Sequence, residues 1–278
     1  MSLIDFILNV VGLVLWLNWR AIPLTVRAPA GASLASTLRR AGPPRPRIYY
    51  LVALIFLLAA RALLYWQLGG QIRWDARISL GPTTVWFRSD MPGRMMLFSL
   101  CSFGATLGIF YLCLLLLSWV NGPIADIEPG QRLVRNHLGA LDRWPGVMKL
   151  LLPLLFTAGA WCALNPLLAR LGLVPQNANP AWRLLAQGAV IGLAVYLLLK
   201  FFLVGVLALH LLNSYVYLGD LPLWSFINAT ARSLLRPLQG LPLRAGKIDF
   251  APLLAIAVVL AGAHLSQRGL AQLYQELI

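Results

Sequence analysis

The sequence predicts an all-α protein that crosses a membrane several times. Of its 278 residues, 59% are hydrophobic and 12% are charged, whereas about a quarter of residues are charged in soluble domains. The apolar residues gather in runs close to the roughly 20 residues that a helix needs to cross a bilayer. These runs are rich in Leu, Ala and Val without strict alternation, which favours helices over a β-barrel.

Six runs are long and apolar enough to be spans, the first and last being short enough to be re-entrant or partly interfacial. We expect the spans at 3–19, 48–68, 97–120, 150–171, 184–212 and 248–265. The first run carries Asp5 where a secretory signal would carry cations, so we interpret it as an uncleaved span. The connection 69–96 holds a β-branched and aromatic run typical of a short hairpin or an interfacial loop.

The positive charge lies between the spans and not on one soluble domain, so the net charge of +14 predicts no nucleic-acid partner. The first, third and fifth connections hold most of the Lys and Arg residues, which places them in the cytoplasm of a bacterial inner membrane and both termini in the periplasm. Cations there would meet anionic lipid headgroups. Those predicted to do so are Arg39, Arg40, Arg132, Arg135, Arg143, Arg232 and Arg236.

A weak internal repeat orders the chain as span, polar-aromatic exit, basic amphipathic segment, Pro/Gly break and span. One copy runs through "LLLSWVNG" and "RLVRNHLGALDRWPG", another through "LLNSYV" and "NATARSLLRPLQG", and a fainter one through "LWLNW" and "SLASTLRRAGPP". The repeat predicts three parts, at 1–96, 97–172 and 173–278.

The basic segment of the last copy has helical periodicity. Its apolar residues fall on one side, and they are Leu223, Trp224, Ile227, Ala231, Leu234, Leu235 and Leu238. Its polar residues fall on the other, and they are Ser225, Asn228, Arg232, Arg236 and Gln239. This pattern predicts a helix in the plane of the headgroups with its apolar face toward the lipid.

The segment "LLRPLQGLPLRAGKIDFAPLLAIAVVL" resembles the YggT family of bacterial and plastid membrane proteins. The likeness covers about 201–269, with a weaker second module at about 97–171. The residues that carry the motif or its structure are Arg232, Arg236, Pro237, Gly246, Asp249 and Pro252. The resemblance implies a non-enzymatic scaffold, assembly factor or accessory subunit of a membrane complex, since family members are linked to membrane-protein assembly, envelope organisation and osmotic tolerance.

Asp249 stands where the basic segment meets the last span. One interpretation is a helix N-cap, in which the carboxylate accepts unpaired backbone N–H groups. The other is a charge lock, in which it pairs with Lys247, Arg244 or an arginine of another repeat. If Asp249 is a cap, Asp249→Asn should have a mild effect, because asparagine caps helices nearly as well. If Asp249 is a charge lock, the same substitution should be damaging.

Two cations fall inside predicted spans, where an unpaired charge is costly and is a functional-site hypothesis by default. Arg61 either has a functional role inside the membrane or extends its charged end toward the outer end of its helix. Lys200 lies in the middle of a run of 29 residues, which either tilts or stands partly outside the lipid. If both line a cavity, the chain is a channel or transporter component instead.

His210 and His264 lie in the last two spans and could bind a haem, although membrane histidines are more often packing residues. "GATLG" (104–108) and "GAVIG" (188–192) fit the GxxxG pattern of close helix packing. The chain has no nucleotide-binding loop, serine-hydrolase elbow or zinc-protease motif, and its three cysteines have no metal-binding spacing. We therefore expect no catalytic or metal site and no cofactor beyond bound lipids.

Overall fold

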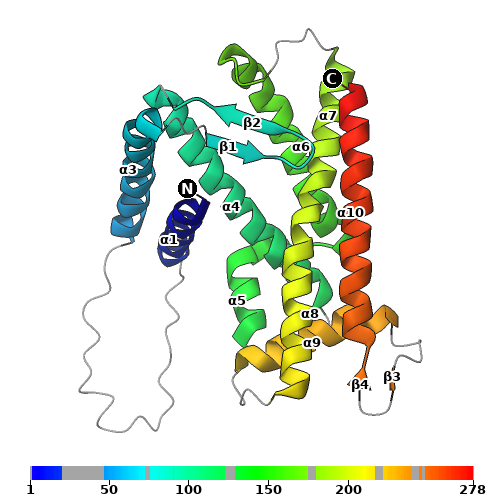
Figure 1. Ribbon diagram of the computed structural model, residues 1–278. Helices are drawn as coiled ribbons and strands as arrows, with labels where there is room; N and C mark the ends of the chain where they lie inside the picture. Colours follow the sequence, from blue (N-terminus) through cyan, green and yellow to red (C-terminus); the bar gives the residue numbers. More distant parts are fainter. Residues whose placement is uncertain are drawn as a thin grey trace, which may run out of the picture. The chain divides into compact units, whose positions relative to one another are not determined.

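A computed structural model describes residues 2–20, 47–72, 76–89, 91–122, 129–174, 180–216, 222–238, 244–245 and 248–277. Six helical stretches there are long and apolar enough to cross a membrane, which confirms the predicted fold class. They are α1 (Ser2–Arg20), α3 (Ile48–Ile72), α4 (Pro92–Val120), α6 (Gly146–Arg170), the continuous pair α7 (Ala181–Val195) and α8 (Leu199–Tyr215), and α10 (Ala251–Leu277). Each overlaps one predicted span (Figure 1).

The chain forms two compact units. The first comprises residues 1–76 and 87–107, and the second comprises 77–86 and 108–278. The division between them falls inside α4, so one helix contributes residues to both units, whereas the sequence repeat placed its first boundary at residue 96.

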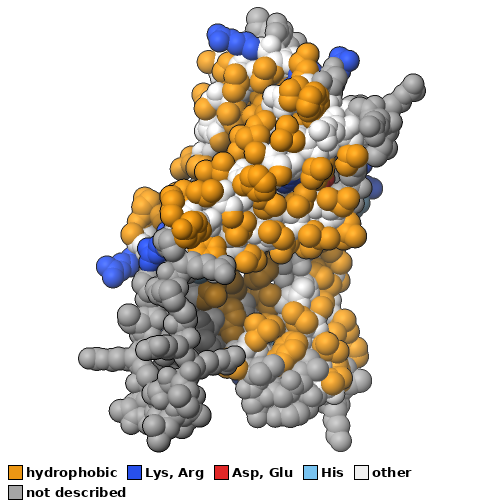
Figure 2. Space-filling model, turned by 90° about the vertical axis from the view of Figure 1, so that its left-hand side faces the viewer, with side chains coloured by type: hydrophobic (Ala, Val, Ile, Leu, Met, Phe, Trp, Pro, Cys, Tyr) orange, Lys and Arg blue, Asp and Glu red, His pale blue; other side chains and the backbone are white. Residues whose placement is uncertain are grey.

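In the first unit, α1 packs along α3. The contact is built around Leu54, Leu58 and the ring of Phe103, and Gly12 of α1 lets that ring approach. A Cβ atom added at Gly12 would lie 2.9 Å from Phe103 Cε2. The outward faces of α1 and α3 stay apolar, and Phe6 and Phe56 are 65% and 73% exposed. Hydrophobic side chains cover most of the described surface in Figure 2, as expected for helices surrounded by lipid.

In the second unit, α6 and α7 approach closely through the "GAVIG" glycines. A Cβ atom at Gly188 would lie 3.0 Å from the Ala158 carbonyl oxygen, and one at Gly192 would lie 2.8 Å from that of Leu154. The predicted packing role of this pair is confirmed. The "GATLG" glycines differ, because a Cβ atom at Gly104 would meet no heavy atom of the described chain within 4 Å.

The fifth span is a helix of 35 residues, Ala181–Tyr215, interrupted by the 3₁₀ turn η2 (Tyr196–Leu198). At 1.5 Å per residue it is about 52 Å long, against a hydrocarbon core of about 30 Å. The tighter turn shifts the register of side chains between α7 and α8.

The repeat is visible as two runs of elements in the same order. α4 leads through α5 (Pro129–Leu138) and the 3₁₀ turn η1 (Gly139–Arg143) to α6. α8 leads through α9 (Pro222–Leu235) and the 3₁₀ turn η3 (Arg236–Leu238) to α10. Before α10, the two-residue strands β3 (Arg244–Ala245) and β4 (Ile248–Asp249) pair antiparallel.

The predicted amphipathic helix is α9, which lies across α8 and α10 in Figure 1. Its apolar face covers these two helices, where Ile227, Ala231 and Leu235 pack with Val206 and Leu207. The periodicity had predicted that this face rests on lipid, but the face packs against protein, with Leu223 as the exception at 61% exposed. Arg232 and Arg236 are exposed on the opposite side.

The connection between α3 and α4 contains a two-stranded hairpin, which confirms the hairpin alternative. β1 (Ala76–Ser79) and β2 (Thr84–Phe87) form it. Gly81 at the turn has φ +87°, a conformation that a side chain would strain. A Cβ atom there would also lie 2.6 Å from Cβ of Ala194, so the turn sits directly on α7.

Candidate functional site

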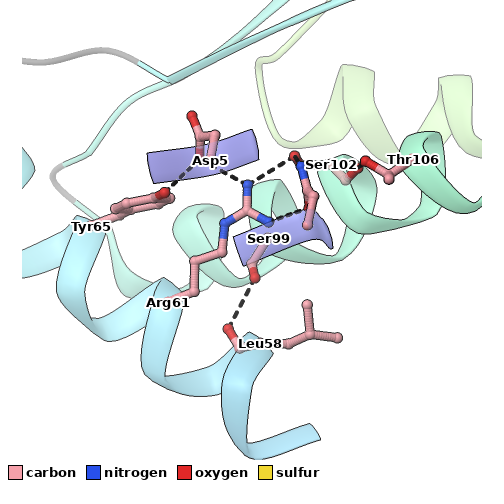
Figure 3. Close-up of polar contacts among 8 residues, drawn as sticks. Asp5, Leu58, Arg61, Tyr65, Ser99, Ser102 and Thr106 are labelled. Carbon is pink, nitrogen blue, oxygen red and sulfur yellow. Dashed lines mark hydrogen bonds and ion pairs between the residues drawn. The ribbon is translucent and has the colours of Figure 1, made fainter. Parts of the chain in front are cut away.

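Arg61 of α3 is the most deeply buried charge in the described chain, with 1% of its surface exposed. Its Nη2 atom lies 2.9 Å from Oδ1 of Asp5 in α1 and donates a hydrogen bond of 2.8 Å to Oγ of Ser102 in α4. Its Nη1 atom donates a hydrogen bond of 2.7 Å to Oδ1 of Asn9. Figure 3 shows the Arg61 side chain reaching toward Asp5 and Ser102. Arg61 thus joins α1, α3 and α4 within the first unit. We name Asp5, Asn9, Arg61, Tyr65 and Ser102 the Arg61 cluster.

Further contacts fix both partners of the ion pair. The Tyr65 hydroxyl donates a hydrogen bond of 2.5 Å to Oδ1 of Asp5. The guanidinium carbon of Arg61 lies 5.5 Å from the ring centre of Tyr65 and 5.4 Å from that of Phe98, within cation–π range. Asn9 donates to Ser102 at 3.1 Å, which closes the network. Arg61 is therefore neutralised and oriented inside the unit, and its side chain does not extend to the helix end.

Lys149 is the centre of a second group of charges, in the second unit. The residue is 8% exposed, and its Nζ atom donates a hydrogen bond of 2.7 Å to Oγ of Ser118. Ser118 in turn donates to Oδ1 of Asp142. Nζ of Lys149 lies 3.7 Å from that oxygen, and Nε of Arg135 lies 3.1 Å from Oδ2 of Asp142. We name Ser118, Arg135, Asp142 and Lys149 the Lys149 cluster.

Polar contacts also connect the two repeats. Asn121, after the end of α4, is fully buried and donates a hydrogen bond of 2.8 Å to Oγ1 of Thr230 in α9. Gly130 of α5 lies under the ring of Phe226 in α9, since a Cβ atom there would be 2.5 Å from the ring. These contacts hold the amphipathic helices of the two repeats together.

Lys200 and the two histidines do not form a common site in the described contacts. Lys200 is half-buried, with Nζ 5.0 Å from the ring centre of Phe201. Nδ1 of His210 donates a hydrogen bond of 2.8 Å to Oδ1 of Asn228, which connects α8 to α9. His264 is exposed on α10. The contact of His210 is the kind that a packing histidine makes.

The motif residues have different surroundings. Pro252 is buried at the start of α10, and Pro237 is exposed in η3. Asp249 lies in β4 directly across from Arg244, two residues before α10 begins, and its side chain is not described. Cap and charge lock both remain predictions. Gly246, Arg39 and Arg40 lie outside the described residues, and Arg132 and Arg143 are exposed.

Sequence reasoning missed both partners of the buried charges. Asp5 was used only to exclude a signal peptide, Asp142 was not singled out, and Arg135 was counted among the headgroup cations. An available signal was the rarity of acids in the spans, because a membrane arginine usually pairs with an acid on a neighbouring helix. Among the described residues, no group of His, Cys, Asp and Glu could hold a metal ion.

Comparisons with protein-family models, curated proteins and solved structures find no match to the chain.

Proposed function

We propose that the chain is a non-enzymatic scaffold or accessory subunit of a membrane-protein complex. The observation that carries the proposal is the Arg61 cluster. Its charged groups are used to hold three helices together and have their partners inside the chain. A buried charge that is paired across three helices can fix their relative positions, as a scaffold requires.

Two further features support the proposal. The outward faces of α1, α3 and α6 are apolar, and Phe156 of α6 is 77% exposed, so large surfaces are open to lipid or to other membrane helices. The exposed arginines of α9, Arg232 and Arg236, suit anionic headgroups. The resemblance of residues 201–269 to the YggT family points the same way.

The channel alternative needs cations that face a water-filled path. Arg61 is a poor candidate, because it is 1% exposed and is enclosed by Asp5, two aromatic rings and two polar side chains. Lys200 is half-buried beside an aromatic ring. A channel role would therefore depend on Lys200 and not on the pair of cations.

The experiment is purification of the tagged chain from its native membrane in a mild detergent, followed by size-exclusion chromatography and protein identification. We expect a stoichiometric membrane partner. Asp5→Asn, which breaks the Arg61 cluster, should release the partner, whereas Asn18→Ala should retain it, because Asn18 is exposed and, among the described contacts, its side chain bonds to the Val14 carbonyl of its own helix. A monomer without partners from wild-type membranes would overturn the proposal.

A further inference from the structure

The two repeats of the second unit can be matched residue by residue at their amphipathic helices. α5 and α9 both begin with a proline, Pro129 and Pro222. Aligning these prolines matches Val134 with Ile227, which are 1% and 8% exposed. Each of these two residues packs on the span before its own helix, which is α4 for Val134 and α8 for Ile227. The alignment therefore tells which position of one repeat corresponds to which position of the other.

The contact between the repeats uses one face of α5 and a different face of α9. Phe226 of α9 covers Gly130 of α5, where an added Cβ atom would lie 2.5 Å from the ring. In the alignment, Phe226 corresponds to Leu133 of α5, and Gly130 corresponds to Leu223 of α9. A contact between non-equivalent faces is head to tail, and it leaves one face of each kind free. Leu133 and Leu223 mark these free faces, since they are 51% and 61% exposed.

The polar contact between the repeats follows the same rule. Asn121 at the end of α4 donates to the Thr230 hydroxyl, which itself donates to the carbonyl oxygen four residues earlier, at Phe226. The residue of α5 that corresponds to Thr230 is His137, and its Nδ1 bonds the carbonyl oxygen four residues earlier, at Leu133. Because a carbonyl oxygen accepts, Nδ1 carries the proton of the neutral ring and Nε2 is an acceptor. His137 thus offers the acceptor that Thr230 offers in the other repeat.

A matching donor lies near the end of α8. Leu115 of α4 is buried against α5, and Leu207 of α8 is buried against α9. Aligning these two leucines matches Asn121 with Asn213, which is half-buried in the last turn of α8. Asn213 of one molecule is therefore the donor that corresponds to Asn121, and His137 of another molecule is the acceptor that corresponds to Thr230.

We propose that copies of this chain assemble head to tail by repeating the contact between the two repeats. Leu133 of one copy packs on Leu223 of the next. His137 of the first copy accepts a hydrogen bond from Asn213 of the second. Leucine on leucine replaces phenylalanine on glycine, so that one large side chain over none becomes two of intermediate size.

The direction of the spans allows this assembly within one membrane. α4 and α8 cross the membrane in the same direction, because one span, α6, lies between them. Parallel repeats of this kind are related by an axis along the membrane normal. Repeating their contact therefore keeps successive copies in the same membrane with the same orientation. The assembly needs no second kind of protein, so the inference goes beyond the proposed function.

Disulfide cross-linking in native membranes tests the proposal. Two tagged forms of the full chain are co-expressed, one with Leu133→Cys and the other with Leu223→Cys, after the three native cysteines are replaced by alanine. Mild oxidation should join the two forms to each other, and neither form to itself. Ser225→Cys replaces Leu223→Cys in the control and should give several-fold less product, because Ser225 is exposed on another face of α9. Absence of a product between the two forms would overturn the proposal. Products of each form with itself alone would also overturn it, since the contact would then be two-fold symmetric.

A second set of variants tests the contact without cysteines. Leu133→Gln and Leu223→Gln should each convert the detergent-purified protein from oligomer to monomer in size-exclusion chromatography with light scattering. Both residues are exposed, so the helical circular dichroism should not change. Phe156→Gln is the control and should leave the oligomer intact, because Phe156 is 77% exposed on α6, away from both faces. A wild-type monomer, or an oligomer that all three variants retain equally, would contradict the proposed contact.

Discussion

The ion pair between Asp5 and Arg61 allows a sharp test of what holds α1 in place. Asp5→Asn keeps the size of the side chain and one acceptor oxygen but removes its negative charge. Arg61 is 1% exposed, and its other polar partners in the described network, Asn9 and Ser102, are neutral. A buried cation without its counter-charge is strongly destabilising, whereas replacing both partners by apolar residues is often neutral.

The expected magnitude follows from this burial. Breaking a buried pair by removing one partner costs about 3–5 kcal/mol. In a protein of this size, each kcal/mol lowers the melting temperature by roughly 2–4 °C. Asp5→Asn should therefore lower the melting temperature by about 6–20 °C. The double variant Asp5→Leu with Arg61→Leu should lose less than Asp5→Asn, because no charge is then left uncompensated.

The assay is thermal unfolding of the purified variants in one detergent, followed by tryptophan fluorescence. Asn18→Ala is the control, because Asn18 lies on the same helix and bonds to its own backbone. A melting temperature for Asp5→Asn equal to that of the control would refute the reasoning. The double variant Asp5→Leu with Arg61→Leu is also compared with Asp5→Leu alone and Arg61→Leu alone. If its loss of stability equals the sum of the two single losses, the pair has no coupling energy and the reasoning is refuted.

Three other predictions concern packing, the second charge cluster and the motif aspartate. Gly192→Ala should cost about 1–3 kcal/mol of unfolding free energy, because its Cβ would lie 2.8 Å from an α6 carbonyl oxygen, whereas Gly205→Ala, with open space on α8, should cost nothing in the same unfolding assay. Asp142→Asn should cost about 3 kcal/mol or more by removing the negative charge that lies beside the buried Lys149, and a melting temperature within about 2 °C of wild type would contradict this. Asp249→Asn should lower stability by less than about 1 kcal/mol if Asp249 caps α10, whereas a charge lock predicts a larger loss that exchanging Arg244 and Asp249 restores.

The spans could be predicted from sequence because their signal is local. A run of about 20 apolar residues specifies a membrane helix without reference to the rest of the chain. The same holds for α9, where a period of 3.6 residues correctly placed Ile227, Ala231 and Leu235 on one face. What covers that face is a property of the tertiary structure. Periodicity could not distinguish lipid from the sides of α8 and α10.

The candidate site was less predictable, because its partners are distant in sequence. Arg61 was identified as unusual from its position inside a span, but Asp5 lies 56 residues away. Lys149 was not singled out, because it lies directly before the predicted span 150–171. Its hydrogen-bond partner Ser118 lies 31 residues earlier in the chain. A charge count by connection cannot reveal such pairs.

The separation of Asp5 and Arg61 also has a consequence for biosynthesis. Chains are made from the N-terminus at about 5–20 residues per second. The 56 residues between the two side chains therefore delay the arginine by about 3–11 seconds after the aspartate is made. Through this interval α1 carries an acid whose counter-charge has not yet been synthesised. The ion pair between α1 and α3 can therefore form only after the second span has been synthesised.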